Sequence, residues 1–406
     1  MTVLSDRGVI LKKSLSTPPP IPQSAIQDVL AMLETGRLFR YEEDRTEQPI
    51  TAIFEKKFAS LLGAKYAMAV NSCGCGMFLA LQSAGVRPGD AVLTNAFTLA
   101  PVPGAIAHAG GKPILVESNK DLTIDFSDLQ YKALVSQSKF LLLSHMRGHV
   151  PDMNQITAFC EQANITIIED CAHTLGARWD GTAVGRFGKA ACFSTQSFKH
   201  LNSGEGGIVI TDDPSIATGI IFRSGSYHHH LQSGTLPPSE EMEKAQYHLP
   251  NYSMRMSAMT ATLLLHQLPN LEQNIQRWNR LYDSLYNQLE RIGHLELISR
   301  DSREQFVGSS LQFFISAKLN PTEMARFLQK CAKRGVYIKW YGRTDPEGFT
   351  SRPEHWKYIR NAQVNQTLEI TRTLCDIRIP LTLEESDSKI IASVIESELS
   401  EIQRKT

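Results

Sequence analysis

Short apolar runs alternate with helical patterns from about residue 25 to about residue 215. The runs are uninterrupted, which is typical of strands buried on both faces of a sheet. Strands that alternate with helices predict a mostly parallel α/β sheet with helices on both faces. The seven predicted strands are Tyr66–Asn71, Ala91–Thr94, Pro113–Glu117, Lys139–Ser144, Ile165–Glu169, Ala190–Thr195 and Gly206–Thr211. The predicted helices among the earlier strands include Ile53–Leu62, Gly76–Ala84, Val102–Ala109 and Met153–Ala163.

The pattern changes in the second half of the chain. Residues 222–250 are polar and rich in His, Ser and Pro, so we expect a long loop there. An amphipathic helix follows, because apolar residues recur at three- and four-residue steps over Leu271–Ile292. A smaller α/β segment then closes with a helix around Ile390–Leu399. At the other end, Pro18-Pro19-Pro20 cannot be helical and predicts an extended arm. The predicted division is an N-terminal arm over 1–25, a large domain over 26–270 and a small C-terminal domain over 271–406.

Composition narrows the expected partners. The 42 Lys and Arg residues balance the 42 Asp and Glu residues, so no net field points to nucleic acid or to an anionic membrane. No apolar run reaches membrane-spanning length, and the N-terminus lacks the apolar stretch of a secretory signal. The seven cysteines show no paired spacing, which indicates reduced thiols in a cytoplasmic protein. Cys73 and Cys75 have no second Cys/His pair at zinc spacing, so we expect no metal.

Three stretches carry candidate chemistry. Asn71–Gly76 joins a strand to a helix with small residues, and the start of that helix suits a phosphate; a tight turn is the alternative. The strand that ends at Asp170 places a carboxylate where ligands of α/β sheets gather. That carboxylate can hold a cationic ring nitrogen or, alternatively, cap the next helix. Lys199 lies just past a strand end between Phe198 and Leu201. Partial burial would lower its pKa and free the amine for Schiff-base chemistry, although most lysines are surface charges.

In this order, the three stretches resemble the fold-type I pyridoxal phosphate (PLP) enzymes, and specifically the DegT/DnrJ/StrS family of sugar aminotransferases. The resemblance extends from about Leu30 to the C-terminus. It implies a large domain with a mostly parallel seven-stranded sheet and a smaller C-terminal α/β domain. Its most specific stretches are Ile168–Ala177 and Gly204–Asp212, and a further match is Asn251–Met256.

The resemblance also implies roles for single residues. Lys199 would hold PLP as a Schiff base and later shuttle protons. Asp170 would pair with the pyridinium nitrogen and make the ring an electron sink, and His173 would lie beside the ring. The implied cofactor-binding residues are Ser72, Cys73, Gly74, Phe97, Leu99, Asp170, His173, Ser194, Lys199 and Ser253. Enzymes of this family are homodimers whose sites are completed by the partner chain, so the loop before Arg255 should cross over.

The chain departs from the family pattern at several positions. The family usually has Gly-Thr where this chain has Cys73-Gly74, which removes one hydroxyl contact to the phosphate. It usually stacks an aromatic residue on the ring, for which Phe97 and Leu99 are the two candidates here. Ser253 stands where a partner-chain Asn often reaches the phosphate. One branch replaces the lysine with His and performs dehydration, whereas Lys199 is present in this chain.

Arg147 is the candidate substrate-binding residue. It follows the predicted strand Lys139–Ser144, and the carboxyl end of such a strand faces the ligand crevice. The resembling family commonly has an aromatic residue at this position. A guanidinium binds a carboxylate or a phosphate through two hydrogen bonds, so we predict that Arg147 binds an anionic group of the substrate. An ion pair at the surface or between subunits is the alternative.

The sequence therefore predicts an aminotransferase. It would move an amino group from an amino-acid donor, such as glutamate, to a ketone or aldehyde in a sugar-like or small biosynthetic intermediate. A PLP-dependent lyase or cyclase acting on an amino acid would use the same Lys199, Asp170 and His173. A non-catalytic regulator with the PLP fold is a third possibility, against which the intact Lys199 and Asp170 argue.

Overall fold

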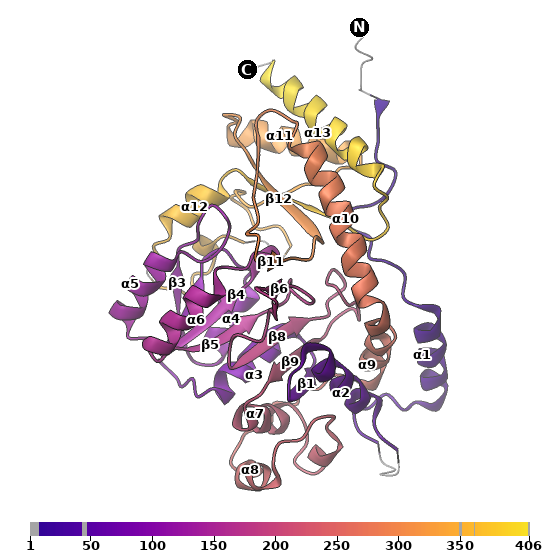
Figure 1. Cartoon of the computed structure of the whole chain (residues 1–406), viewed down its shortest axis with the longest axis vertical. Coiled ribbons are helices and arrows are strands. Elements are labelled where there is room, and N and C mark those ends of the chain that lie inside the picture. The colour runs from indigo at the N-terminus through magenta and orange to yellow at the C-terminus, as the bar shows by residue number, and fades with distance from the viewer. Residues whose placement is uncertain (1–7, 43–46, 349–350, 361, 405–406) are drawn as a thin grey trace.

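The computed structural model describes residues 8–42, 47–348, 351–360 and 362–404. Residues 1–7 of the predicted arm lie outside the described residues. The centre of the molecule is a seven-stranded sheet with the order β1-β9-β8-β5-β4-β2-β3 (Figure 1). Strand β9 is antiparallel to both of its neighbours, and the pairs from β8 to β3 are parallel. The strands are β1 (Tyr66–Val70), β2 (Ala91–Asn95), β3 (Lys112–Val116), β4 (Phe140–Ser144), β5 (Thr166–Asp170), β8 (Ala190–Ser194) and β9 (Gly207–Thr211).

The sheet is mostly parallel and every predicted strand forms, with its ends within one residue of the expected positions. Successive side chains of each strand enter two different cores, as the two-residue period of a strand requires. Leu141 and Leu143 pack in one core, whereas Leu142 packs in the other. The first core includes residues of α2 (Ile50–Leu62), α5 (Phe126–Ser136), α6 (Met153–Gln162) and α9 (Ala258–Leu265). The second includes residues of α3 (Cys73–Ser83), α4 (Pro101–His108) and α7 (Pro214–Ser224).

The long loop expected over 222–250 is wrong in part. The segment contains the short helix α8 (Ser239–Ala245) and a 3-10 turn, η3 (His230–Gln232). Met242 of α8 is buried in the core with α7, and Glu240 and Lys244 form an ion pair one turn apart. Met242 is the one fully buried residue of α8, and Ala245 packs partly buried against the same core, so the apolar side of the helix is too small for composition to indicate it.

We refer to the elements from the amphipathic helix α10 (Leu271–Leu289) onward as the small domain and to those before it as the large domain; α10 follows the turn η4 (Leu268–Asn270). An antiparallel sheet with the order β10-β12-β14-β13 has helices packed on its apolar face. The expected closing helix forms as α13. The remaining elements of this half are β10 (Leu295–Leu297), β12 (Ser310–Ile315), α11 (Pro321–Lys333), β13 (Lys339–Trp340), η5 (Pro353–His355), α12 (Asn365–Thr371), β14 (Leu374–Arg378) and α13 (Asp387–Gln403). A third, three-stranded sheet joins β11 (Glu304–Gln305) to β6 (Arg178–Trp179) and β7 (Thr182–Ala183).

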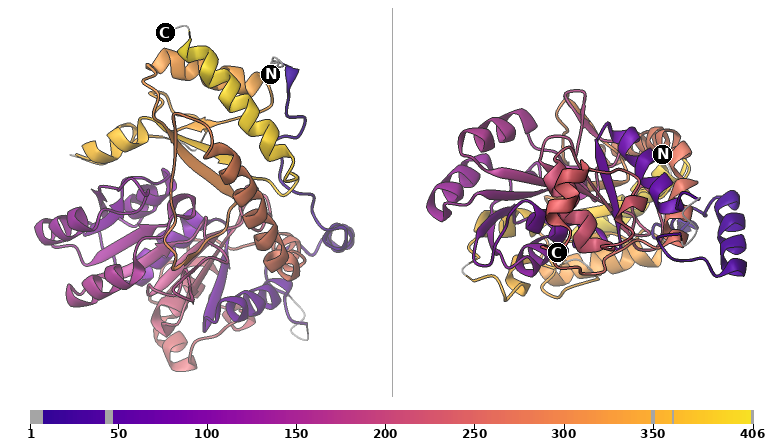
Figure 2. Two further views of the ribbon diagram at one scale, coloured as in Figure 1. Left: turned by 45° about the horizontal axis from the view of Figure 1, so that its top comes forward. Right: turned by 90° about the horizontal axis from the view of Figure 1, so that it is seen from below.

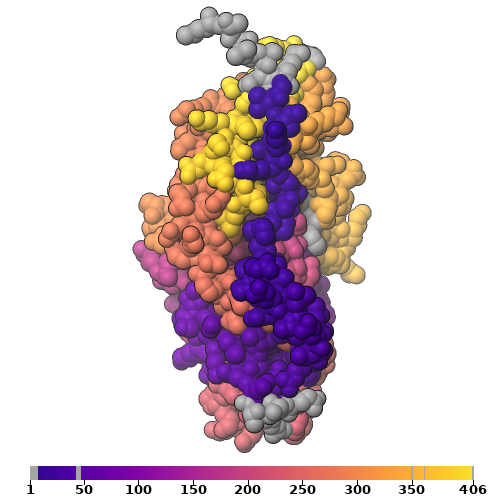
Figure 3. Space-filling view, turned by 90° about the vertical axis from the view of Figure 1, so that its right-hand side faces the viewer, coloured from indigo at the N-terminus to yellow at the C-terminus, as the bar shows by residue number. Residues whose placement is uncertain are grey.

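The N-terminal segment runs along the small domain before it reaches the large one (Figures 2 and 3). Leu11 and Leu15 are buried in the main core, and Lys13 forms a 2.8 Å ion pair with Asp387 of α13. Helix α1 (Gln23–Thr35) then lies at the edge of the molecule, so the last three residues assigned to the arm are helical.

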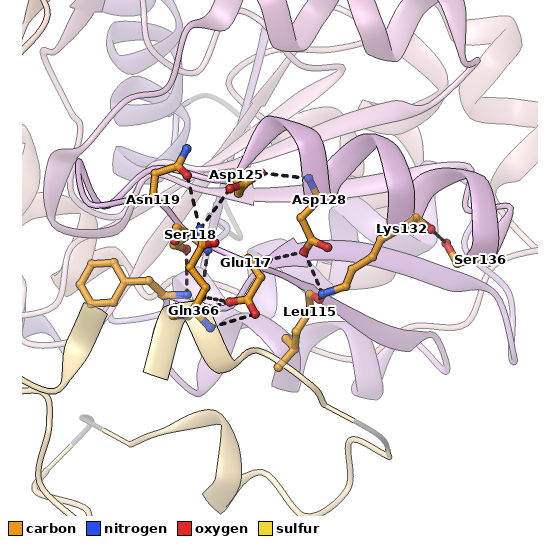
Figure 4. Close-up of polar contacts among 11 residues, drawn as sticks. Leu115, Glu117, Ser118, Asn119, Asp125, Asp128, Lys132, Ser136 and Gln366 are labelled. Atoms are coloured by element: carbon orange, nitrogen blue, oxygen red, sulfur yellow. Dashed lines mark hydrogen bonds and ion pairs between the residues drawn. The ribbon is translucent and has the colours of Figure 1, made fainter. Parts of the chain in front are cut away.

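A polar contact joins the small domain to the edge strand β3 (Figure 4). The Glu117 carboxylate accepts hydrogen bonds from the backbone of Thr367 at 2.7 Å, from the Thr367 hydroxyl at 2.6 Å and from the backbone of Gln366 at 3.2 Å. The Gln366 side chain donates in return to the Ser118 carbonyl at 3.0 Å. Helix α12 is therefore capped by a residue of the large domain.

No helix among the described residues is long and apolar enough to cross a membrane.

Candidate active site

A cavity of about 270 Å³ lies at the carboxyl ends of β4, β5 and β8. Its wall contains nine residues that the sequence singled out: Ser72, Cys73, Gly74, Leu99, Arg147, Asp170, His173, Ser194 and Lys199. Phe97 and Ser253 are not part of this wall. The carboxyl edge of a parallel sheet is where the loops of successive strands converge, so residues far apart in sequence meet there.

The start of α3 forms one end of the cavity. The Ser72 hydroxyl caps the helix by accepting a 3.1 Å hydrogen bond from the backbone N–H of Cys75. Strand β9 passes so close that a Cβ on Gly207 would lie 2.5 Å from the Cys73 nitrogen. The first turn of α3 carries no acidic residue. Its N–H groups and the positive end of its dipole can therefore receive a phosphate.

Asp170 is held at the end of β5 by two hydrogen bonds. Its carboxylate accepts from the Ser144 hydroxyl at 2.7 Å and from the backbone of Ala172 at 3.1 Å. The Ser144 hydroxyl accepts in turn from Thr98 at 2.8 Å. A turn follows Asp170, so it does not cap a helix. Burial and the neighbouring Asp170 carboxylate raise the pKa of Cys73, whose thiol lies 3.9 Å from Asp170.

Lys199 lies in the loop between β8 and β9, and its Nζ is 3.0 Å from His173 Nε2. Burial, followed by the positive charges of Arg147 and Arg378, lowers the pKa of Lys199 to about 8, against an opposing contribution from Asp170. The pKa of His173 is also lowered well below its usual value, first by burial and then by Lys199. A neutral imidazole in hydrogen-bond contact with an amine whose pKa lies near 8 can exchange a proton with a substrate at low cost near neutral pH.

Leu99 and Phe97, the two residues expected to cover the cofactor ring, lie in different surroundings. Leu99 lines the cavity, whereas Phe97 packs edge-on against Tyr341 with ring centroids 5.1 Å apart. Ser253 is exposed, and its φ of +60° places it in the left-handed region. It lies outside the cavity of its own chain.

Arg147 lies in the wall of the cavity in the turn η2 (Met146–Gly148). Its Nε donates to the Tyr341 hydroxyl at 2.8 Å, and its Nη2 lies 2.7 Å from Asp376 Oδ2. This ion pair is buried and connects the two domains of one chain. The backbone of Arg147 is left-handed (φ 57°, ψ 22°), which costs about 1–2 kcal/mol for a residue with a side chain. Strain of this kind is characteristic of functional sites.

Two cavity residues from the small domain were not predicted from the sequence. Lys339 and Arg378 line the cavity from β13 and β14, and the Arg378 guanidinium stacks 3.9 Å from the centroid of the Phe198 ring. A usable signal was present, because Asp376 and Arg378 alternate with apolar residues in an otherwise buried strand. Charges at every second position of a buried strand indicate that one face of the strand borders an enclosed polar site and not open solvent.

Comparison with known proteins identifies the fold and the chemistry. The family model of the DegT/DnrJ/EryC1/StrS aminotransferases matches residues 21–395. The chain belongs to this family. It is therefore a PLP-dependent aminotransferase, as the sequence predicted.

Its relatives include a spore coat polysaccharide biosynthesis protein and a GDP-perosamine synthase. This aminotransferase is 31% identical to the spore coat polysaccharide biosynthesis protein SpsC of Bacillus subtilis (strain 168), over 67% of this chain and 68% of that protein. It is 29% identical to the GDP-perosamine synthase of Escherichia coli O157:H7, over 62% of this chain and 66% of that protein. The crystal structure of 3-amino-5-hydroxybenzoic acid synthase shares the fold, with a TM-score of 0.79 and 23% identity over 96% of this chain and all of that chain.

The residues of this aminotransferase fit PLP. The start of α3 suits its phosphate, the buried Asp170 carboxylate suits its cationic ring nitrogen, and Lys199 offers an amine of lowered pKa. The three features surround one cavity.

Proposed function

We propose that this aminotransferase moves an amino group from an amino-acid donor, such as glutamate, to the carbonyl group of a small biosynthetic intermediate. The observation that carries the proposal is the 3.0 Å contact between Lys199 Nζ and His173 Nε2 in the cavity that Asp170 also lines. A transamination needs a base that takes a proton from the donor carbon and returns it at a neighbouring position. A buried amine with a pKa of about 8 can do both near neutral pH.

Each residue would have a distinct task. Lys199 would hold the cofactor covalently and then move the proton. Asp170, oriented by Ser144, would keep the ring nitrogen protonated, and His173, itself neutral, would hold the Lys199 amine by a hydrogen bond. When bound, PLP withdraws electrons from the substrate carbon. Leu99 would cover the ring with an apolar surface, in place of the aromatic residue of its relatives.

The cofactor phosphate would lie at the start of α3, close to Ser72, Cys73 and Gly74, with Ser194 on the same wall. Two backbone N–H groups and the helix dipole would replace the hydroxyl contact that this chain lacks. The partner's copy of the exposed Ser253 would complete the site in a homodimer.

An apolar surface supports the proposed homodimer. On α1, Ile26, Leu30 and Leu33 are spaced along one side and are between 39% and 55% exposed. Phe39, just after α1, is 51% exposed. Contiguous apolar side chains at the edge of a monomer indicate a protein interface.

The cysteines of the described residues are all free, which supports the reducing, cytoplasmic compartment that we expect.

The half-reaction tests the proposal. L-glutamate added to the PLP-loaded enzyme without an acceptor should convert the cofactor to pyridoxamine phosphate in a 1:1 ratio to active sites and release 2-oxoglutarate. A lyase or cyclase would instead consume the amino acid and return the original cofactor spectrum. The second outcome, with any proteinogenic amino acid, would contradict transamination and favour elimination or cyclisation.

A further inference from the structure

Positive charge gathers on the side of the cavity that faces the small domain. Lys339 of β13 is paired with Asp376 of β14, and Arg378 lies two residues further along the same strand. Residues that are cross-strand partners, or two apart in one strand, project from the same face of a sheet. Lys339, Asp376 and Arg378 therefore point together toward the large domain. Arg147 approaches them from the turn η2, which follows β4.

Of these three cations, Arg147 alone has a carboxylate within ion-pair distance among the described residues. Asp376 contacts Arg147 Nη2 at 2.7 Å and accepts a hydrogen bond from Gln312 at 2.7 Å. Within the part of the chain that the structure describes, no side chain or carbonyl accepts a hydrogen bond from Lys339 Nζ or from the Arg378 guanidinium. Both cations rest on aromatic rings instead, with Arg378 Cζ 3.9 Å from the Phe198 centroid and Lys339 Nζ 5.6 Å from that of Tyr341.

The cations repel one another. Burial and then the charge of Arg147 lower the pKa of Lys339 to about 8, and the same two causes lower the pKa of Arg378. An anion bound between them would relieve this repulsion and supply the missing acceptors. The stacking of Arg378 on Phe198 holds its guanidinium in place, so little of its freedom is lost when an anion binds.

The charged group lies beside the reacting amine. Arg147 and Arg378 share the wall of the 270 Å³ cavity with Lys199, and all three also line a smaller adjoining cavity of about 50 Å³. An anion held there would be close to the substrate carbon that exchanges the amino group. In a long substrate, a charged group far from the reacting carbon would lie outside this part of the cavity.

We propose that Arg147, Lys339 and Arg378 form a subsite for a carboxylate or phosphate group of the acceptor, so that the acceptor is a small anionic aldehyde or ketone. This assignment rests on the aminotransferase function proposed above. Donor and acceptor occupy the same site in turn, so the α-carboxylate of the donor would use the subsite in the first half of the cycle. A neutral carbonyl compound would leave Lys339 and Arg378 without an acceptor in the second half, and Arg147 with Asp376 alone.

Three matched aldehydes test the subsite. The apoenzyme is loaded directly with pyridoxamine phosphate, and single-turnover return of the PLP spectrum is followed with glyoxylate, glycolaldehyde phosphate or glycolaldehyde. We expect at least one of the anionic aldehydes to react about tenfold faster or more than the neutral one at equal concentration. The faster of the two anions shows whether the subsite prefers a carboxylate or a phosphate.

Variants then locate the effect. Arg378→Gln and Lys339→Gln should each remove most of the advantage of the anionic aldehydes over glycolaldehyde, measured as the ratio of the two rates within one variant, so that a change in the Lys199 amine affects both rates alike. Arg326→Gln is the matched control. Arg326 is exposed on α11 of the same domain, so this substitution removes the same charge at a place away from the cavity. Equal rates for the three aldehydes in the native enzyme, or an anion advantage that survives in both variants, would overturn the proposal.

Two further measurements separate this proposal from others. If the variants bind pyridoxamine phosphate more weakly, with unchanged discrimination among the aldehydes, the cations serve the cofactor and the subsite is wrong. If transamination fails with every donor and aldehyde, calorimetric titration of the PLP-loaded enzyme with succinate and with inorganic phosphate decides the matter. Binding that Arg378→Gln abolishes and Arg326→Gln preserves supports the subsite, whereas binding of neither anion overturns it.

Discussion

The lowered pKa of Lys199 predicts the pH dependence of cofactor capture. Only the neutral amine attacks the PLP aldehyde, so the rate at which apoenzyme captures PLP should follow the neutral fraction of Lys199. With a pKa of about 8, about one Lys199 side chain in ten is neutral at pH 7. An ordinary lysine would be neutral in about one molecule in 3,000, so burial and neighbouring charge raise the capture rate about 300-fold at this pH.

The sign of the effect can be tested with two substitutions that act in opposite directions. Arg378→Gln removes a positive neighbour that disfavours the charged amine, so the pKa of Lys199 should rise from about 8 toward its ordinary value. It should not reach that value, because burial, the largest cause, remains. Asp170→Asn removes a negative neighbour that favours the charged amine, so the pKa should fall below 8. Capture should therefore slow at pH 7 in the first variant and accelerate in the second.

Stopped-flow absorbance of the lysine adduct, measured from about pH 6 to about pH 10.5, gives the midpoint for each protein. Arg326→Gln is again the control and should leave the midpoint unchanged. A midpoint near 10.5 in the native enzyme would show that the Lys199 amine is exposed to water and has the pKa of an ordinary lysine. A shift of the same sign in Arg378→Gln and Asp170→Asn would show that local charge does not set the pKa of Lys199.

Three other changes have defined outcomes. Asp170→Asn should lower kcat at least about tenfold without lowering the melting temperature appreciably, because a neutral amide cannot keep the ring nitrogen protonated; a smaller loss would refute that role. Glu117→Ala should raise amide exchange in α12 (Asn365–Thr371) about tenfold or more, because three hydrogen bonds to a carboxylate are lost, whereas unchanged protection would mean that packing alone holds the helix. Leu30→Glu should convert a homodimer into monomers by light scattering and reduce activity with it; a native enzyme that is a fully active monomer would contradict the shared site.

The large domain could be predicted from sequence because its strands are short, uninterrupted apolar runs with turn residues at both ends. Burial on both faces leaves such runs few alternatives. Helix α5 (Phe126–Ser136) was not predicted, because only Leu129 and Ala133 among its residues are buried and most of the others are polar or exposed. Its start depends on the Asp125 cap, which is a local signal that a search for apolar periodicity does not detect.

The same reasoning explains what could be predicted of the site. Asp170 and Ser194 end the parallel strands β5 and β8, and the loop at Ser72 follows β1, so these residues meet at one edge of the sheet. Lys339 and Arg378 reach the cavity only because the small-domain sheet turns one face toward the large domain. That approach is set by packing between segments more than 150 residues apart in the chain, as in the contact between Arg147 and Asp376. No local pattern encodes it.

The large and small domains contribute different residues to the site, and this bears on substrate specificity. The residues proposed to act on the cofactor come from the large domain, whereas two of the three proposed anion-binding cations come from the small one. The two sets meet through Arg147, whose guanidinium contacts Tyr341 and Asp376 across the domain boundary. Breaking a buried pair by removing one partner costs about 3–5 kcal/mol, so Asp376 ties the position of Arg147 to that of the small domain. A shift of the small-domain sheet would therefore move all three cations together and leave Asp170 and the start of α3 in place. We therefore expect substitutions on β13 and β14 to change which anionic acceptor is used while the groups that hold the cofactor ring and phosphate stay in place.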